Sequence, residues 1–146
     1  MQQSDLVGDL EELVLRLSAL TTRREGFSRT AAATLTRLAT SGATRLTELA
    51  VAEEVSQPSM SGLAARLVDQ GLVHRGSDPQ DARVVLLSLT PAGEELVAHR
   101  RDARAQRLAS ALADLPEDDV ARIAAAVPAL TRLADALRRS TKEVSR

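Results

Sequence analysis

Apolar side chains recur at three- and four-residue intervals over residues 46–73, with one interruption at the run VSQPS. This spacing predicts two amphipathic helices. In the interruption, Ser56 can accept a hydrogen bond from a backbone N–H of the next turn, and Pro58 suits the first turn of a helix. The second helix is therefore expected to begin near Gln57.

A different pattern follows Gln70-Gly71, which is expected to end that helix. The runs LVHRG and RVVLLSLT are rich in leucine and β-branched residues, and SDPQDA between them has the composition of a turn. Two helices followed by two strands are the order of a winged helix-turn-helix. The chain is therefore predicted to be mainly α (α+β), with about six helices and a two- or three-stranded β wing.

The first turn of the second helix carries four short or flexible side chains, Gln57, Ser59, Met60 and Ser61. A recognition helix enters the major groove with its N-terminal end first, and such side chains suit base edges. These four residues are predicted to face DNA.

The predicted hairpin carries Asp81 and Arg83 near its tip. The carboxylate can fix the guanidinium direction through a bidentate pair, and an arginine on a protruding hairpin can enter a minor groove. The alternative is an exposed pair that only stabilises the turn, worth about 0 to 1 kcal/mol.

Both ends of the chain are also predicted to be helical. Ser28 is expected to cap a helix over residues 29–40 that ends at Gly42, and Pro91 is expected to open a long helix through Ala113. A break at residues 115–118 precedes a last helix, whose axis Pro128 is predicted to bend. Two apolar stripes mark the first and last helices: Leu6, Leu10, Leu13, Leu17 and Leu20, and Val120, Ile123, Val127, Leu130, Leu133 and Leu137.

A compact winged domain of this size cannot bury both stripes, which predicts a homodimer. We expect one domain over residues 1–146, with a winged DNA-binding region at 28–90 and dimerisation helices at 1–27 and 91–146. An isologous dimer should bind an inverted repeat with half-sites about 10 bp apart. The alternative is that the stripes pack within one chain.

Composition limits the other function classes. The 146 residues include no cysteine, which excludes disulfides and Cys-ligated zinc. An acidic N-terminus and the lack of a membrane-length apolar run predict a cytoplasmic protein with no membrane partner. The net charge of −1 is low for a DNA-binding protein. We therefore expect basic residues 23–45 to form a positive face opposite acidic residues 5–12 and 116–119, and few phosphate contacts.

The residues do not favour an enzyme. His74 and His99 lack partners at metal-ligand spacing, and no GxSxG elbow or glycine-rich phosphate loop is present. No catalytic residue, metal or cofactor is therefore predicted. One aromatic residue, Phe27, is too few for RNA stacking platforms. A winged-helix dimer that docks on proteins without contacting DNA remains the alternative, and an enzyme ranks below it.

Four motifs in order carry a family resemblance: SQPSMS, GLVHR, DPQDAR and LTPAG. With these motifs the chain resembles the MarR family of bacterial transcription regulators. The resemblance implies a homodimer that binds a palindromic operator in double-stranded DNA, with the second helix in the major groove and the wing arginine in the minor groove. A repressor, with its own gene among the candidate targets, is the expectation, and an activator is the alternative.

The resemblance also implies the residues that meet DNA. Ser56, Ser59 and Ser61 would face the bases, and Arg83 would be the wing arginine. One departure is Gly62, where many relatives have an arginine. The full set of residues expected at DNA adds Arg45, Thr47 and Asp81, and Arg66 and Arg75 at phosphates.

MarR-like proteins often bind a small anionic, frequently phenolic, effector. By position, Arg16, Arg24 and Phe27 could meet such a ligand. The alternative, that all three are solvated or core residues, is favoured by the sequence.

Overall fold

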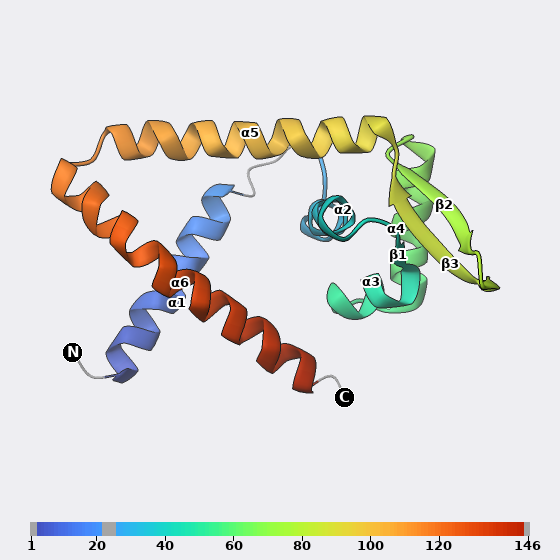
Figure 1. Ribbon diagram of the computed structural model, residues 1–146, viewed down its shortest axis with the longest axis horizontal. Coiled ribbons are helices and arrows are strands. Elements are labelled where there is room, and N and C mark those ends of the chain that lie inside the picture. Colours follow the sequence, from blue (N-terminus) through green and yellow to red (C-terminus); the bar gives the residue numbers. More distant parts are fainter. Residues whose placement is uncertain (1–2, 22–25, 145–146) are drawn as a thin grey trace. The chain divides into compact units, whose positions relative to one another are not determined.

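The computed structural model describes residues 3–21 and 26–144. The chain divides into two compact units, Met1–Arg104 and Ala105–Arg146. The elements in chain order are α1 (Gln3–Thr21), α2 (Arg29–Ser41), β1 (Thr44–Arg45), α3 (Leu46–Ala52), α4 (Gln57–Asp69), β2 (Val73–Asp78), β3 (Asp81–Leu89), α5 (Pro91–Ala113) and α6 (Glu117–Val144). Six helices and a three-stranded sheet (Figure 1) confirm the predicted fold class.

Two serines cap helices as the sequence predicts. The Ser28 hydroxyl accepts from the N–H of Ala31 at 3.1 Å at the start of α2. The Ser56 hydroxyl accepts from the N–H of Ser59 at 3.3 Å at the start of α4. Each bond satisfies a backbone donor that the first helical turn leaves without a partner. These caps determine where α2 and α4 begin.

The turn between α3 and α4 has a strained backbone. Glu54 has φ of 54°, in the left-handed region that non-glycine residues rarely adopt. The Glu54 N–H donates to the Val51 carbonyl at 3.2 Å, and the Val55 N–H donates to the Ala50 carbonyl at 3.0 Å. These bonds hold the chain in the sharp turn that separates the two helices.

The sheet is antiparallel, with β3 between β1 and β2. We call the β2–β3 hairpin the wing. Only Pro79 and Gln80 lie between its strands, so the expectation of a six-residue turn over 77–82 was wrong. Asp78 accepts from the Gln80 N–H at 2.9 Å, and Asp81 accepts from the Arg83 N–H at 3.0 Å. The two carboxylates thus satisfy backbone donors that a longer loop would leave to water.

The Leu-Thr-x-x-Gly motif joins the start of α5 to the end of the α4 segment. The Thr90 hydroxyl donates to the Gly71 carbonyl at 2.6 Å and accepts from the Gly93 N–H at 3.0 Å. The Thr90 N–H donates to the Leu72 carbonyl at 3.1 Å. A Cβ at Gly93 would overlap that Leu72 carbonyl oxygen, so only glycine fits there. The motif is therefore structural in this chain.

The core lies between α2, α3, α4 and the sheet, whose elements contact one another (Figure 1). Its fully buried large side chains are Leu35, Leu49, Met60, Leu67, Val73 and Leu87. We call residues 29–89, which supply most of this core, the winged segment. Burying these side chains is the main favourable contribution to its stability.

The apolar stripes of α1 and α6 are exposed instead. In α1, Leu6, Leu13 and Leu17 are 41–48% exposed. In α6, Ile123, Val127, Leu130, Leu133 and Leu137 are 42–61% exposed. Pro128 lies inside α6 without ending it. Of the other predicted stripe positions, Leu10 and Val120 are half-buried, and the side chain of Leu20 lies outside the described residues.

Candidate nucleic-acid interface

Helix α4 has one face in the core and one face in solvent. Met60, Leu63, Ala64 and Leu67 point into the core, at 0–6% exposure. Met60 was expected to face DNA, and that expectation was wrong because Leu63 and Ala64, three and four residues later, place it on the core face of the helix. The sequence could have shown this, because Met60 continues the three- and four-residue spacing of the apolar positions in α4.

The other candidates of the first turn lie on the open side of α4. Gln57 and Ser59 are exposed, and Ser61 is half-buried. The exposed Ser56 hydroxyl accepts from the Ser59 N–H and donates to the Ser59 hydroxyl at 2.9 Å. Ser59 accepts that bond and so keeps its own hydroxyl proton for a further acceptor. Ser56 therefore positions Ser59 as well as capping the helix.

The wing presents an arginine whose guanidinium is unengaged. Arg83 lies near the tip on β3 and is exposed. The Asp81 carboxylate accepts from the Arg83 backbone N–H, which stabilises the turn, and it does not form the bidentate pair with the Arg83 guanidinium that the sequence allowed. Within the described ranges, no ion pair includes the Arg83 side chain. The guanidinium is thus available to an external acceptor.

A second arginine is used inside the fold. Arg45 Nη2 lies 3.2 Å from Asp78 Oδ2, joining β1 to the end of β2. The Gln80 N–H holds the pKa of the Asp78 carboxyl below its usual value; desolvation opposes this shift, and the Arg45 guanidinium adds to it. Arg45 was predicted to contact DNA, and here it supports the wing. Sequence reasoning did not predict this pair, because its members are 33 residues apart.

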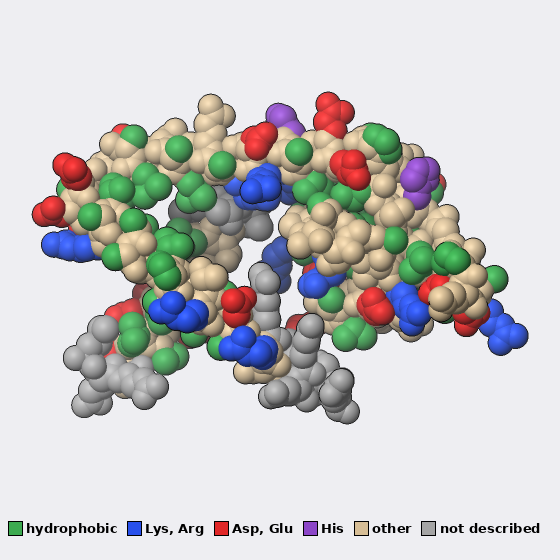
Figure 2. Space-filling view, in the orientation of Figure 1, with side chains coloured by type: hydrophobic (Ala, Val, Ile, Leu, Met, Phe, Trp, Pro, Cys, Tyr) green, Lys and Arg blue, Asp and Glu red, His purple; other side chains and the backbone are tan. Residues whose placement is uncertain are grey.

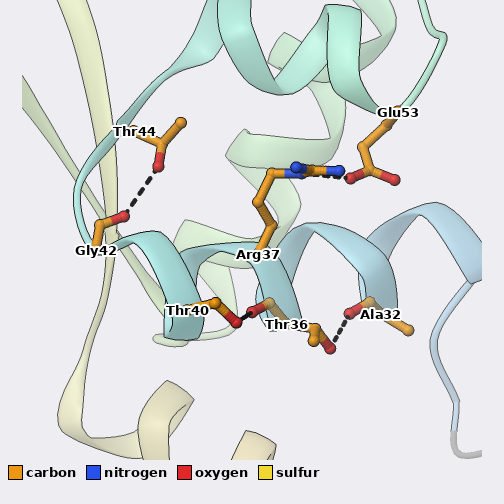
Figure 3. Close-up of polar contacts among 7 residues, drawn as sticks. All are labelled: Ala32, Thr36, Arg37, Thr40, Gly42, Thr44 and Glu53. Atoms are coloured by element: carbon orange, nitrogen blue, oxygen red, sulfur yellow. Dashed lines mark hydrogen bonds and ion pairs between the residues drawn. The ribbon is translucent and has the colours of Figure 1, made fainter. Parts of the chain in front are cut away.

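Another ion pair anchors the helix-turn-helix to α2 (Figure 3). Arg37 Nε lies 3.0 Å from Glu53 Oε1, and the Glu53 side chain is only 11% exposed. Figure 3 shows the Arg37 side chain reaching from α2 to the residue that follows α3. This contact was not predicted. It fixes the turn that precedes α4 and so contributes to how α4 is presented.

The remaining basic and polar candidates are on the surface. Thr47, Arg66 and Arg75 are exposed, on α3, α4 and β2. On the side shown in Figure 2, basic and acidic side chains alternate over the winged segment. The ion pairs of Arg37 and Arg45 place carboxylates among the arginines that were expected to form a positive face.

Two of the three effector candidates, Arg16 and Phe27, have partners within the chain. Arg16 lies 3.8 Å from Glu12, and both side chains are about three-quarters exposed, at 76% and 74%. Phe27 packs against the core, and the Arg100 guanidinium carbon lies 5.4 Å from its ring centroid. Arg24 lies outside the described residues. Arg100 was not among the predicted residues.

The described part of the chain contains no group of three or more His, Asp or Glu side chains that could hold a metal ion. None of its helices is long and apolar enough to cross a membrane.

Comparisons with known proteins agree with this arrangement. The model of the MarR family matches residues 27–85. An uncharacterised HTH-type transcriptional regulator of Mycobacterium bovis, Mb0904, is 41% identical in an alignment over 125 residues that covers 82% of this chain and 87% of that protein.

Solved structures share the fold. Rv1404 of Mycobacterium tuberculosis is 22% identical with a TM-score of 0.77, covering 90% of this chain and 94% of its own. Bordetella bronchiseptica BpsR, whose DNA binding is described as regulated by 6-hydroxynicotinic acid, is 25% identical with a TM-score of 0.61, covering 92% and 94%. On its sequence and its fold, this chain belongs to the MarR family of helix-turn-helix transcription regulators.

Proposed function

We propose that this transcription regulator binds double-stranded DNA at an inverted repeat as a homodimer and represses the genes that it controls, its own gene among them. The observation that carries the proposal is the open face of α4 next to a wing with an unengaged arginine. Gln57 and Ser59 are exposed in the first turn of α4, and Arg83 is exposed on β3.

Each part of this surface has a role suited to its chemistry. The first turn of α4 enters the major groove, where Ser59, Gln57 and Ser61 meet base edges. Arg83 enters the adjacent minor groove, whose negative potential attracts a guanidinium. Arg75 and Thr47 bind phosphates, which position the protein without selecting a sequence.

The exposed stripes of α1 and α6 support the dimer. Leucines and valines spaced three and four residues apart on both helices remain more than 40% exposed in one chain. Contiguous apolar surface of this kind marks an interaction site in a protein of this size. A second copy of the chain carries the same stripes, and a twofold axis would present two α4 helices to two half-sites.

Control by a small effector is part of the proposal. Its support is the likeness to BpsR and the aromatic ring of Phe27 beside the Arg100 guanidinium. An anionic aromatic ligand would act by binding the DNA-incompetent state more tightly than the competent one. In a panel of aromatic acids, at least one compound should raise the apparent Kd for the operator. No shift with any of the panel would contradict this part of the proposal.

Fluorescence anisotropy of the full chain tests the main proposal. Duplexes from the DNA that flanks its gene are titrated with protein in the presence of unrelated competitor DNA. Saturable binding at two chains per duplex is the expected result, with a shallow salt dependence because the net charge is −1. Binding no tighter than to unrelated DNA, both for these duplexes and for duplexes selected from a random library, would refute it.

Two arginine variants sharpen the test. Arg83→Ala removes the wing guanidinium and should weaken operator binding at least tenfold. Arg122→Ala removes the same charge from α6, where the side chain is 76% exposed and paired with Asp119, and should leave binding within twofold. Equal effects of both variants would refute the role of the wing.

A further inference from the structure

Gly62 stands in the middle of α4 without a structural reason inside the chain. Its φ lies outside the left-handed region that favours glycine, and a Cβ built on it would meet only one atom within 4 Å, Arg66 Nη1 at 3.7 Å. That distance is an ordinary van der Waals contact. A glycine inside a helix costs about 0.5–1 kcal/mol relative to alanine. The helix therefore gives up stability at a position where alanine would fit.

The position of Gly62 on the helix is informative. The core side of α4 is formed by Met60, Leu63, Ala64 and Leu67. At 100° per residue, Gly62 lies on the outer side, in one row with Ser59 and Arg66. This is the side that the proposed function places in the major groove.

Arg66 fills the space that Gly62 leaves. Its side chain runs toward the N-terminus of α4, as helical side chains do, and brings Nη1 over the glycine one turn earlier. Arg66 is exposed, and no ion pair among the described residues engages its guanidinium. The guanidinium is thus on the outer face of α4, one turn closer to the helix N-terminus than its own Cα.

We propose that Arg66 reads a base edge in the major groove through the gap at Gly62, so that these two residues together determine specificity at one base pair of each half-site. Guanine is the expected partner, because its O6 and N7 accept a bidentate pair from a guanidinium. A long side chain at position 62 would occupy the space over the helix that the Arg66 guanidinium needs. The inference rests on the proposed function, since it requires α4 to bind the major groove.

The inference changes the role first predicted for Arg66, a phosphate contact. A phosphate contact would weaken all sequences alike when it is lost, whereas a base contact loses discrimination at one position. The chemistry of the side chain also differs between the two roles. Lysine can replace arginine at a phosphate as a point charge, but it lacks the planar fork that a guanine edge selects.

Four single variants of the chain, and a double variant with Arg66→Ala and Gly62→Leu, test the proposal. An operator is first selected from a random duplex library with the unmodified protein, and each of its base pairs is then replaced in turn. Kd values for this panel are measured with Arg66→Ala, Arg66→Lys, Gly62→Leu and Gly62→Ala, after circular dichroism has established that each variant is folded. Gly62→Ala adds the smallest side chain possible at this position, and its Cβ would lie 3.7 Å from Nη1.

Arg66→Ala and Gly62→Leu should each lose about 5-fold to 150-fold discrimination at the same base pair, and the double variant should lose no more than either. Arg66→Lys should lose that discrimination while it keeps its affinity for unrelated DNA. Gly62→Ala should lose less of the discrimination than Gly62→Leu and should unfold at a higher denaturant concentration.

Two outcomes would overturn the inference without touching the proposed function. In one, Arg66→Ala weakens every duplex of the panel by the same factor, as loss of a phosphate contact does. In the other, Gly62→Leu leaves the discrimination intact, so that the gap is not needed. If the unmodified protein selects no operator at all, the proposed function itself fails and this inference fails with it.

Discussion

The leucines of the winged segment and the leucines of α1 and α6 have similar spacing along the chain, but they differ in their exposure to solvent. Leu35, Leu49 and Leu67 are at most 2% exposed, whereas Leu130 and Leu133 are 45% and 42% exposed. The winged segment completes its core within one chain because three helices and a sheet converge on it. The stripes of α1 and α6 have no such cover in one chain, which is the physical basis for proposing a second copy.

The largest effect is expected from Leu49→Ala, in the winged segment. Leu49 is fully buried, so its loss removes buried apolar surface and leaves a cavity. The free energy of unfolding should fall by about 2–5 kcal/mol. Urea unfolding followed by circular dichroism, at fixed protein concentration, measures the change. Val51→Ala on the same helix, where the side chain is 66% exposed, should change it by no more than about 0.5 kcal/mol. Equal losses would contradict the assignment of the core.

A change in α6 should instead weaken the association of two chains into a dimer. Leu130→Ala combined with Leu133→Ala removes apolar surface twice in a twofold dimer. Each fully buried leucine contributes about 1.5–3 kcal/mol, and about 1.4 kcal/mol is tenfold in an equilibrium constant. Sedimentation equilibrium should show at least tenfold weaker dimerisation. A stable monomer before substitution, or an unchanged dimer after it, would remove this helix from the proposed interface.

A smaller effect of opposite sign is expected in the turn before α4. Glu54 has φ of 54°, a conformation that costs a non-glycine residue about 1–2 kcal/mol. Glu54→Gly should therefore raise the free energy of unfolding by about 1 kcal/mol, after the greater flexibility of the unfolded chain is subtracted. Glu48→Gly, inside α3, should lower it by about 1 kcal/mol. Thermal unfolding of both variants measures the two signs, and a loss with Glu54→Gly would show that this turn is not strained.

The smallest effect is expected at the wing tip and depends on pH. The pKa of Asp78 is lowered from its ordinary value of 3.8 by the Gln80 N–H and the Arg45 guanidinium. A lowered folded-state pKa means that the carboxylate stabilises the wing above pH 3.8 and that this contribution is lost as the pH falls through the lower, folded value. The Gln80 amide resonance should titrate with a midpoint below 3.8 in the intact protein. Asp78→Ala should abolish that titration step. A midpoint at or above 3.8 would show that the Gln80 N–H and the Arg45 guanidinium do not stabilise the Asp78 carboxylate.

The sequence by itself determined the features that depend on neighbouring residues. Ser28 and Ser56 cap helices through N–H groups three residues later, Gly42 ends α2, and Pro91 opens α5. Such bonds lie within one turn of a helix, so the local composition suffices to predict them. The four ordered motifs likewise identified the family.

Only the tertiary structure decided which side chains remain available for binding. Met60 is buried and Arg45 is paired with Asp78, although both were expected at DNA, and the Arg66 guanidinium lies over Gly62. The Arg45–Asp78 pair joins residues that are 33 positions apart, so a local window of sequence does not reveal it. Met60 is different, because it continues the apolar spacing of α4 and the sequence alone could have placed it in the core. Contacts between distant segments form only when the packed core fixes where each helix and strand lies, and they then determine what the surface can bind.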